Sequence, residues 1–150
     1  MTEENYNYDV RCHTCFKKFI VQLFESHEKN LFLVDKKDWY CDSCKRAYFK
    51  QQTEKLTKSH AEIGFTALEG TPKRISWAEK IRAELIHKVD FLKDSLRFSE
   101  EKEKETSDLA FSLFLLEWQK QTDAKWWIDN RKTTVRDISD RIKEITETIQ

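Results

Sequence analysis

The sequence is poor in the two residues that most often build turns. Its 150 residues include two glycines and one proline. Because a β-sandwich or β-barrel needs many tight turns, this shortage favours a helical fold. It also excludes a glycine-rich phosphate-binding loop, and with it the nucleotide-binding folds that depend on such a loop.

The chain also lacks an excess charge of either sign, and it lacks a long apolar run. Lysine plus arginine and aspartate plus glutamate number 27 each, so a strongly basic nucleic-acid-binding protein is not indicated. A balanced total does not exclude a local basic patch. No apolar run reaches the roughly 20 residues of a membrane-spanning helix. The start, MTEENYNYD, is acidic and polar, unlike a signal peptide. We therefore expect a cytoplasmic protein with reduced cysteines.

All four cysteines lie in two short motifs. Cys12 and Cys15 form one C-x-x-C pair, and Cys41 and Cys44 form the other. This is the pattern of a site with four thiolate ligands, which leaves no position for water and holds one structural Zn²⁺. Two redox-active cysteine pairs are the alternative. With four cysteines present His13 is redundant as a ligand, so we expect it on the surface.

The cysteine motifs predict a zinc module over residues 10–65, after a flexible tail at 1–9. Residues 16–24 are rich in aromatic and β-branched side chains and favour a strand, with a short helix as the alternative, and residues 31–34 favour a second strand. A helix follows from residue 42, capped by Gly64 with a hydrophobic contact from Phe65. This order is that of a treble-clef zinc finger. The positive end of the helix should favour the thiolate of Cys44.

Residues 70–150 predict a helical domain of three to four helices, so the fold class is mainly α. Thr71 and Pro72 begin a helix over 72–98 with one apolar stripe. The charge run at 100–105 is a solvated loop or an exposed first turn. Residues 109–118 are apolar nearly all round, as in a central core helix or one with a face for a partner. A short helix after Asp123 and a last helix from Val135 complete the domain, the last packing on 72–98 or on a second chain.

Two groups of residues are candidates for contact with a partner. Cations flank the cysteine pairs and either offset the charge of the metal site or bind nucleic acid: Lys17, Lys18, Lys45 and Arg46. Tryptophan and arginine recur in two later segments: Trp77, Arg82, Trp126, Trp127 and Arg131. These either pack together, with each arginine stacked on a ring or paired with Glu79 or Asp129, or form an exposed binding surface.

Catalytic signals are weak. His87 and Asp90 lie three residues apart on the predicted long helix, with Asp94 one turn on, which is the minimum for a metal-dependent nuclease. Such a pair arises by chance in a helix rich in charge. The sequence holds no Ser-His-Asp arrangement, H-E-x-x-H motif or phosphate loop. We therefore expect a non-enzymatic protein.

Residues 70–82 (GTPKRISWAEKIR) and 124–131 (AKWWIDNR) also carry a resemblance. The chain resembles a group of small proteins from Gram-positive bacteria, their phages and mobile elements, some of which have a similar pair of N-terminal cysteine knuckles. One departure is Arg74, where glutamine is commoner. The resemblance implies an accessory protein that engages or inhibits a nucleic-acid-processing or defence complex of a bacterial host, as anti-CRISPR proteins do. Direct nucleic-acid binding, with Tyr48 and Phe49 beside the cations, is the alternative.

Overall fold

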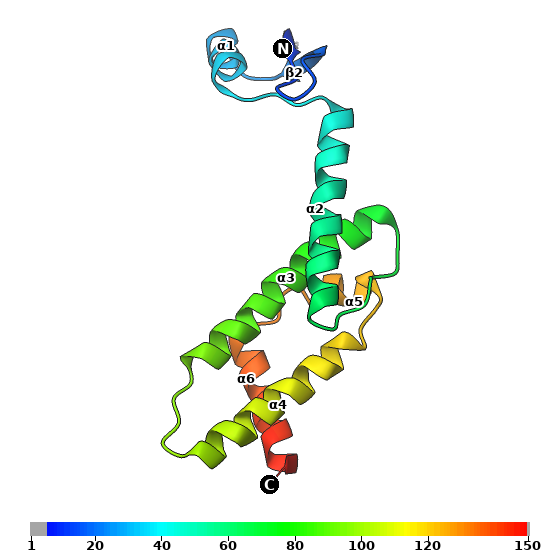
Figure 1. The fold of residues 1–150 in the computed structure, drawn as a ribbon. Coiled ribbons are helices and arrows are strands. Elements are labelled where there is room, and N and C mark those ends of the chain that lie inside the picture. The colour runs from blue at the N-terminus through cyan, green and yellow to red at the C-terminus, as the bar shows by residue number, and fades with distance from the viewer. Residues whose placement is uncertain (1–5, 150) are drawn as a thin grey trace. The chain divides into compact units, whose positions relative to one another are not determined.

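The computed structural model describes residues 6–149 and divides the chain into two compact units (Figure 1). The first unit ends at Gln51 and the second begins at Gln52. This boundary lies inside helix α2 (Asp42–Glu62), whereas the boundary drawn from the sequence, near residues 66–70, lies within the second unit. Of the predicted flexible tail, residues 1–5 lie outside the described residues, and residues 6–9 belong to a strand.

The first unit is built on a β-hairpin. Strand β1 (Tyr6–Arg11) pairs antiparallel with β2 (Lys18–Leu23), in a register that runs from Tyr6 opposite Leu23 to Arg11 opposite Lys18. Because side chains alternate along a strand, the more buried face carries Tyr8, Val10 and their cross-strand partners. The phenol oxygen of Tyr8 lies 2.8 Å from Nδ1 of His27 in helix α1 (His27–Lys36), so α1 packs on β1.

The strand predicted at residues 31–34 is wrong, because these residues lie within α1. Ser26 is the N-cap of this helix: its hydroxyl accepts a hydrogen bond from the Lys29 N–H at 3.4 Å. A run of four apolar residues is too short for its period to separate a strand from a helix. The predicted strand in residues 16–24 is confirmed as β2, and its partner comes from the predicted tail.

Helix α2 ends as the sequence predicts. Gly64 has φ +95°, its N–H donates to the carbonyl of Ala61 at 3.1 Å, and the Phe65 N–H donates to the carbonyl of His60 at 2.9 Å. These two bonds form a Schellman motif, which satisfies carbonyls left open at the helix end. The side chain of Phe65 then enters the core of the second unit.

Four further helices form the second unit within the described residues: α3 (Pro72–Ser95), α4 (Glu101–Gln119), α5 (Ala124–Asp129) and α6 (Val135–Ile149). The predicted start of α3 is confirmed, since the Thr71 hydroxyl accepts from the Arg74 N–H. Helix α4 begins at Glu101, two turns before the apolar segment 109–118, so the charge run forms its exposed first turn. This matches one of the two outcomes expected for that run.

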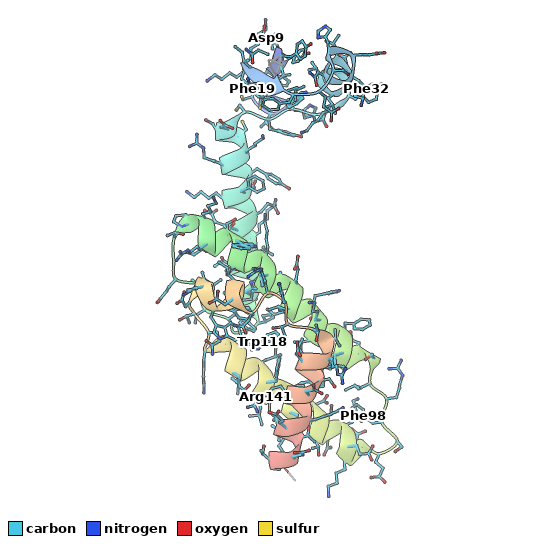
Figure 2. The ribbon with its side chains drawn as sticks, turned by 180° about the vertical axis from the view of Figure 1, so that it is seen from behind. Asp9, Phe19, Phe32, Phe98, Trp118 and Arg141 are labelled. Carbon is cyan, nitrogen blue, oxygen red and sulfur yellow. The ribbon has the colours of Figure 1, made fainter. Side chains whose placement is uncertain are left out.

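The core of the second unit forms where α6 packs on α4 and α3, and where α5 packs on α3. Figure 1 shows α6 lying between α3 and α4, and in Figure 2 Trp118 and Arg141 mark α4 and α6. The apolar seam of α6 packs within the chain. This was one of the two expected arrangements, the other being packing on a second chain. Helix α4 buries Phe111 and Phe114 but leaves Leu109 and Leu116 exposed. It is therefore a core helix on one face only.

The fold class predicted from the sequence is confirmed. The described residues are mostly helical, with one antiparallel hairpin and a cluster of four cysteines close to it. Within residues 6–149, no helix is both long and apolar enough to cross a membrane.

Candidate metal centre and binding surfaces

The two cysteine pairs come from different local structures. Cys12 and Cys15 lie in the turn between β1 and β2, where the Cys12 N–H donates to the Lys17 carbonyl and the Phe16 N–H donates to the Cys12 carbonyl, both at 2.9 Å. Cys41 precedes α2, and Cys44 lies in the first turn of that helix. The His13 N–H donates to the Trp39 carbonyl at 2.7 Å and joins the two segments.

These segments bring all four thiols together. The Sγ atoms of Cys12, Cys15, Cys41 and Cys44 lie within 4.8 Å of one another, and those of Cys15 and Cys41 are 3.7 Å apart. All four cysteines are free thiols, so no disulfide competes for these sulfur atoms. The cluster can hold a metal ion. In the described part of the chain, no other group of cysteine, histidine and carboxylate side chains gathers in this way.

Cys12 is the thiol that ionises most readily. Its pKa is lowered to about 6, because the backbone N–H of Cys15, together with those of Cys41 and Thr14, donates to its sulfur and stabilises the thiolate. The side chain is fully buried. The hydrogen bonds of the knuckle turn therefore prepare one thiolate for a cation.

Cys44 holds its proton more firmly than an ordinary thiol. Its pKa is raised to about 12, first by the hydrogen bond of its thiol with the sulfur of Cys41 and then by that with the sulfur of Cys12. These hydrogen bonds favour the protonated form. The stabilisation of the thiolate by the start of α2 stays a prediction. A metal ion that binds the cluster must displace this proton, since only thiolates are ligands.

His13 lies outside the cluster, as predicted. Its ring is exposed and packs edge-on against Tyr40, with 6.0 Å between ring centroids. Its Nδ1 atom lies 3.9 Å from a carboxylate oxygen of Asp38. The predicted cations beside the knuckles are all exposed: Lys17, Lys18, Lys45 and Arg46.

The two Trp- and Arg-containing segments pack on each other, since α3 contacts α5. Trp77 is half-exposed, and the guanidinium of Arg131 lies 5.7 Å from its ring centroid, a cation–π contact that matches the predicted stacking. Trp126 is half-buried, and its ring centroid lies 4.9 Å from that of Trp127. Trp127 itself is fully buried.

Arg82 and Trp127 therefore have a structural role instead of the predicted contact with a partner. The guanidinium of Arg82 lies 5.9 Å from the Trp127 ring centroid and is 1% exposed. It pairs with Glu79, the partner that the sequence suggested, and donates to the Thr66 carbonyl at 2.9 Å. Burial lowers the pKa of Arg82, and Glu79 opposes this effect.

His60 completes this buried network, and sequence reasoning missed it. Its Nδ1 atom lies 2.7 Å from Oε2 of Glu79 and 3.2 Å from Nε of Arg82. Nδ1 cannot donate to one and accept from the other at once. We assign its proton to the bond with Glu79, because an ionised Glu79 compensates the charge of Arg82. The one sequence signal for this buried contact is that His60, a polar residue, lies four positions before the capping Gly64.

The second unit also contains a cleft of about 970 Å³ between the C-terminal part of α3, the start of α4 and α6. Its apolar lining comes from Leu92, Leu96, Phe98, Phe111, Ile142 and Ile149. The nuclease candidates lie elsewhere: His87, Asp90 and Asp94 are exposed on α3, and no other metal-ligand side chain of the described residues gathers with them.

Comparisons with models of protein families, with curated proteins and with solved structures found no match to this chain. The functional argument therefore rests on the geometry of the cysteine cluster and on the surfaces around it.

Proposed function

We propose that this chain is a non-enzymatic zinc-binding protein that acts by binding a partner through its surface. The observation that supports this most is the closed set of four cysteine sulfur atoms within 4.8 Å. A zinc ion with bonds of about 2.3 Å to four thiolates has sulfur atoms about 3.8 Å apart, close to the 3.7 Å between Cys15 and Cys41. Four protein ligands leave no position for a substrate or an activated water, so the metal is structural.

The surface of the first unit supports a binding role. It exposes large apolar side chains from the hairpin, from α1 and from the start of α2: Phe16, Ile20, Phe24, Phe32, Tyr48 and Phe49. Exposed apolar side chains that form a contiguous patch mark interaction surfaces. The zinc ion then has the task of holding a small unit together while its surface engages a partner.

The partner that we propose is a nucleic-acid-processing or defence complex of a bacterial host. This choice of partner rests on the resemblance of residues 70–82 and 124–131 to proteins of phages and mobile elements. The same resemblance leads us to propose that the protein inhibits the complex. The packing of α5 on α3 joins these two segments into one structural unit.

Affinity purification of the zinc-loaded protein from a bacterial host tests this proposal. Parallel purifications with and without nuclease separate partners held directly from those bridged by nucleic acid. We expect a protein complex to co-purify in both samples, and to be lost when Cys41 is replaced by serine. Recovery of the same proteins with the Cys41→Ser variant, or cleavage of nucleic acid by the pure protein, would argue against a zinc-dependent binding role.

A further inference from the structure

Phe16 has a backbone conformation that its side chain disfavours. It is the one non-glycine residue in the described range 6–149 with a positive φ, at 62°. The knuckle turn imposes this value, because Phe16 donates to the Cys12 carbonyl while Cys12 donates to the carbonyl of Lys17. Glycine adopts the left-handed region without a steric cost, whereas a bulky side chain does not.

The Phe16 side chain does not offset this strain by packing. It is 66% exposed, at the tip of the hairpin between Cys15 and Lys17. A strained residue whose side chain faces water gives nothing to the stability of its turn. Strain of this kind is found at ligand-binding sites, so the ring points to a ligand that packs against it.

Cations without ion-pair partners lie close to Phe16 in the hairpin. Arg11 and Lys18 are directly opposite each other in the hairpin, so their side chains extend from the same face. Like charges in such a pair repel. The nearest acidic residue on this face is Asp9, which lies two residues before Arg11 on β1 and is paired with Ile20. Neither Arg11, Lys17 nor Lys18 forms an ion pair with any residue of the described chain. An anionic ligand would remove this repulsion.

The second knuckle adds cations near the same cluster. Lys45 and Arg46 follow Cys44 directly, and the four cysteine sulfur atoms lie within 4.8 Å of one another. The backbone of both residues is therefore close to the metal centre, as is that of Lys17 and Lys18. Arg46 makes a long hydrogen bond of 3.4 Å to the Asp42 carbonyl and is otherwise open to solvent. A zinc ion bound by four thiolates has a net charge of about −2, so the five cations beside the knuckles outnumber the negative charge that they could offset there.

We propose that the hairpin tip, formed by Arg11, Phe16, Lys17 and Lys18, binds a single strand of nucleic acid. Phe16 stacks on one base, and the three cations contact the phosphates on either side of it. An exposed aromatic ring beside unpaired cations is the combination that binds single strands with little sequence preference. This inference names a ligand for the surface in the proposed function, and it relies on that proposal only for the zinc that folds the unit.

The test is a fluorescence anisotropy titration of the zinc-loaded full chain into a labelled single-stranded oligothymidylate, over a range of salt concentrations. Phe16→Ala should weaken binding about tenfold, the usual effect of losing one base–aromatic stack. Replacing Lys17 and Lys18 by glutamine should reduce the slope of log affinity against log salt by about 1.4. Phe91→Ala is the matched control, since Phe91 is 62% exposed but lies on α3 in the second unit, and it should leave affinity unchanged.

Phe16→Gly separates ligand binding from a structural role. Because glycine accepts the positive φ, the melting temperature of this variant should equal or exceed that of the parent, while its affinity falls as in Phe16→Ala. Unchanged affinity in both Phe16 variants, equal losses in Phe16→Ala and Phe91→Ala, or no binding at low salt would each overturn the proposal. If nuclease treatment leaves a co-purifying protein complex in place while the oligonucleotide does not bind, the hairpin-tip proposal fails and the proposed function stands.

Discussion

Removal of the carboxylate of Glu79 should destabilise the second unit more than any change to a surface charge. Glu79 is fully buried and accepts hydrogen bonds from both His60 and Arg82. In Glu79→Ala the guanidinium of Arg82, 1% exposed, loses its ionised partner and keeps only neutral acceptors, the Thr66 carbonyl and Nδ1 of His60. Breaking a buried ion pair by removing one partner costs about 3–5 kcal/mol, because the other charge stays buried without compensation.

A surface pair in the same unit provides the control. Arg141 and Glu117 join α6 to α4, and their side chains are 45% and 42% exposed. Water screens this pair, so Glu117→Ala should cost at most about 1 kcal/mol. Replacing the whole buried network with His60→Leu, Glu79→Leu and Arg82→Met should recover most of the loss of Glu79→Ala, since no charge is then left buried.

Urea unfolding followed by tryptophan fluorescence measures these differences. Four of the five tryptophans, Trp77, Trp118, Trp126 and Trp127, lie in the second unit, so the signal reports mainly on its unfolding. The reasoning fails if Glu79→Ala loses no more stability than Glu117→Ala. It also fails if the triple replacement is less stable than Glu79→Ala alone.

Two other predictions concern the metal centre and the last helix. Cys41→Ser should unfold the first unit, because the free energy of metal binding drives the folding of this unit, and it should leave the melting of the second unit unchanged. Circular dichroism during heating reports the unfolding of both units. A melting profile identical to that of the parent would refute the zinc assignment. Thr134 and Asp137 cap α6 reciprocally, so Thr134→Ala should cost about 1 kcal/mol in urea unfolding. The Thr134 N–H lowers the pKa of Asp137, so the stability from this carboxylate is present above its unfolded pKa and is lost as pH falls below 3.8. Asp137→Asn should remove that part of the acid sensitivity, and a variant with the parent's pH profile of unfolding would contradict it.

The parts of the fold that the sequence predicts are those with local signals. Thr71-Pro72 marks the start of α3, Gly64 marks the end of α2, and the cysteine spacing marks the metal centre. Each helix end depends on residues within a few positions of one another, and the metal centre depends on two such short motifs separated by 25 residues. Their physical cause, a cap, a positive φ or a ligand spacing, can therefore be identified without knowledge of the rest of the chain.

Features that depend on distant residues were not accessible in this way. Residues 6–9 look like a polar tail, and only pairing with β2 makes them a strand. The buried state of Arg82 results from three separate segments, which supply Glu79, His60 and the Thr66 carbonyl. Charged side chains are seldom buried unless they are paired. The sequence suggests the Glu79 pair, but the contributions of His60 and Thr66 depend on the fold. The strain at Phe16 likewise depends on the whole knuckle turn.

X-ray absorption at the zinc K edge tests the central claim most directly, because it counts and identifies the atoms bound to the metal in the purified protein. A structural centre formed by Cys12, Cys15, Cys41 and Cys44 should give four sulfur neighbours at about 2.3 Å and no other ligand. A nitrogen or oxygen neighbour at about 2.0–2.1 Å would show an open or mixed coordination shell, and would contradict both the closed site and the non-catalytic role derived from it.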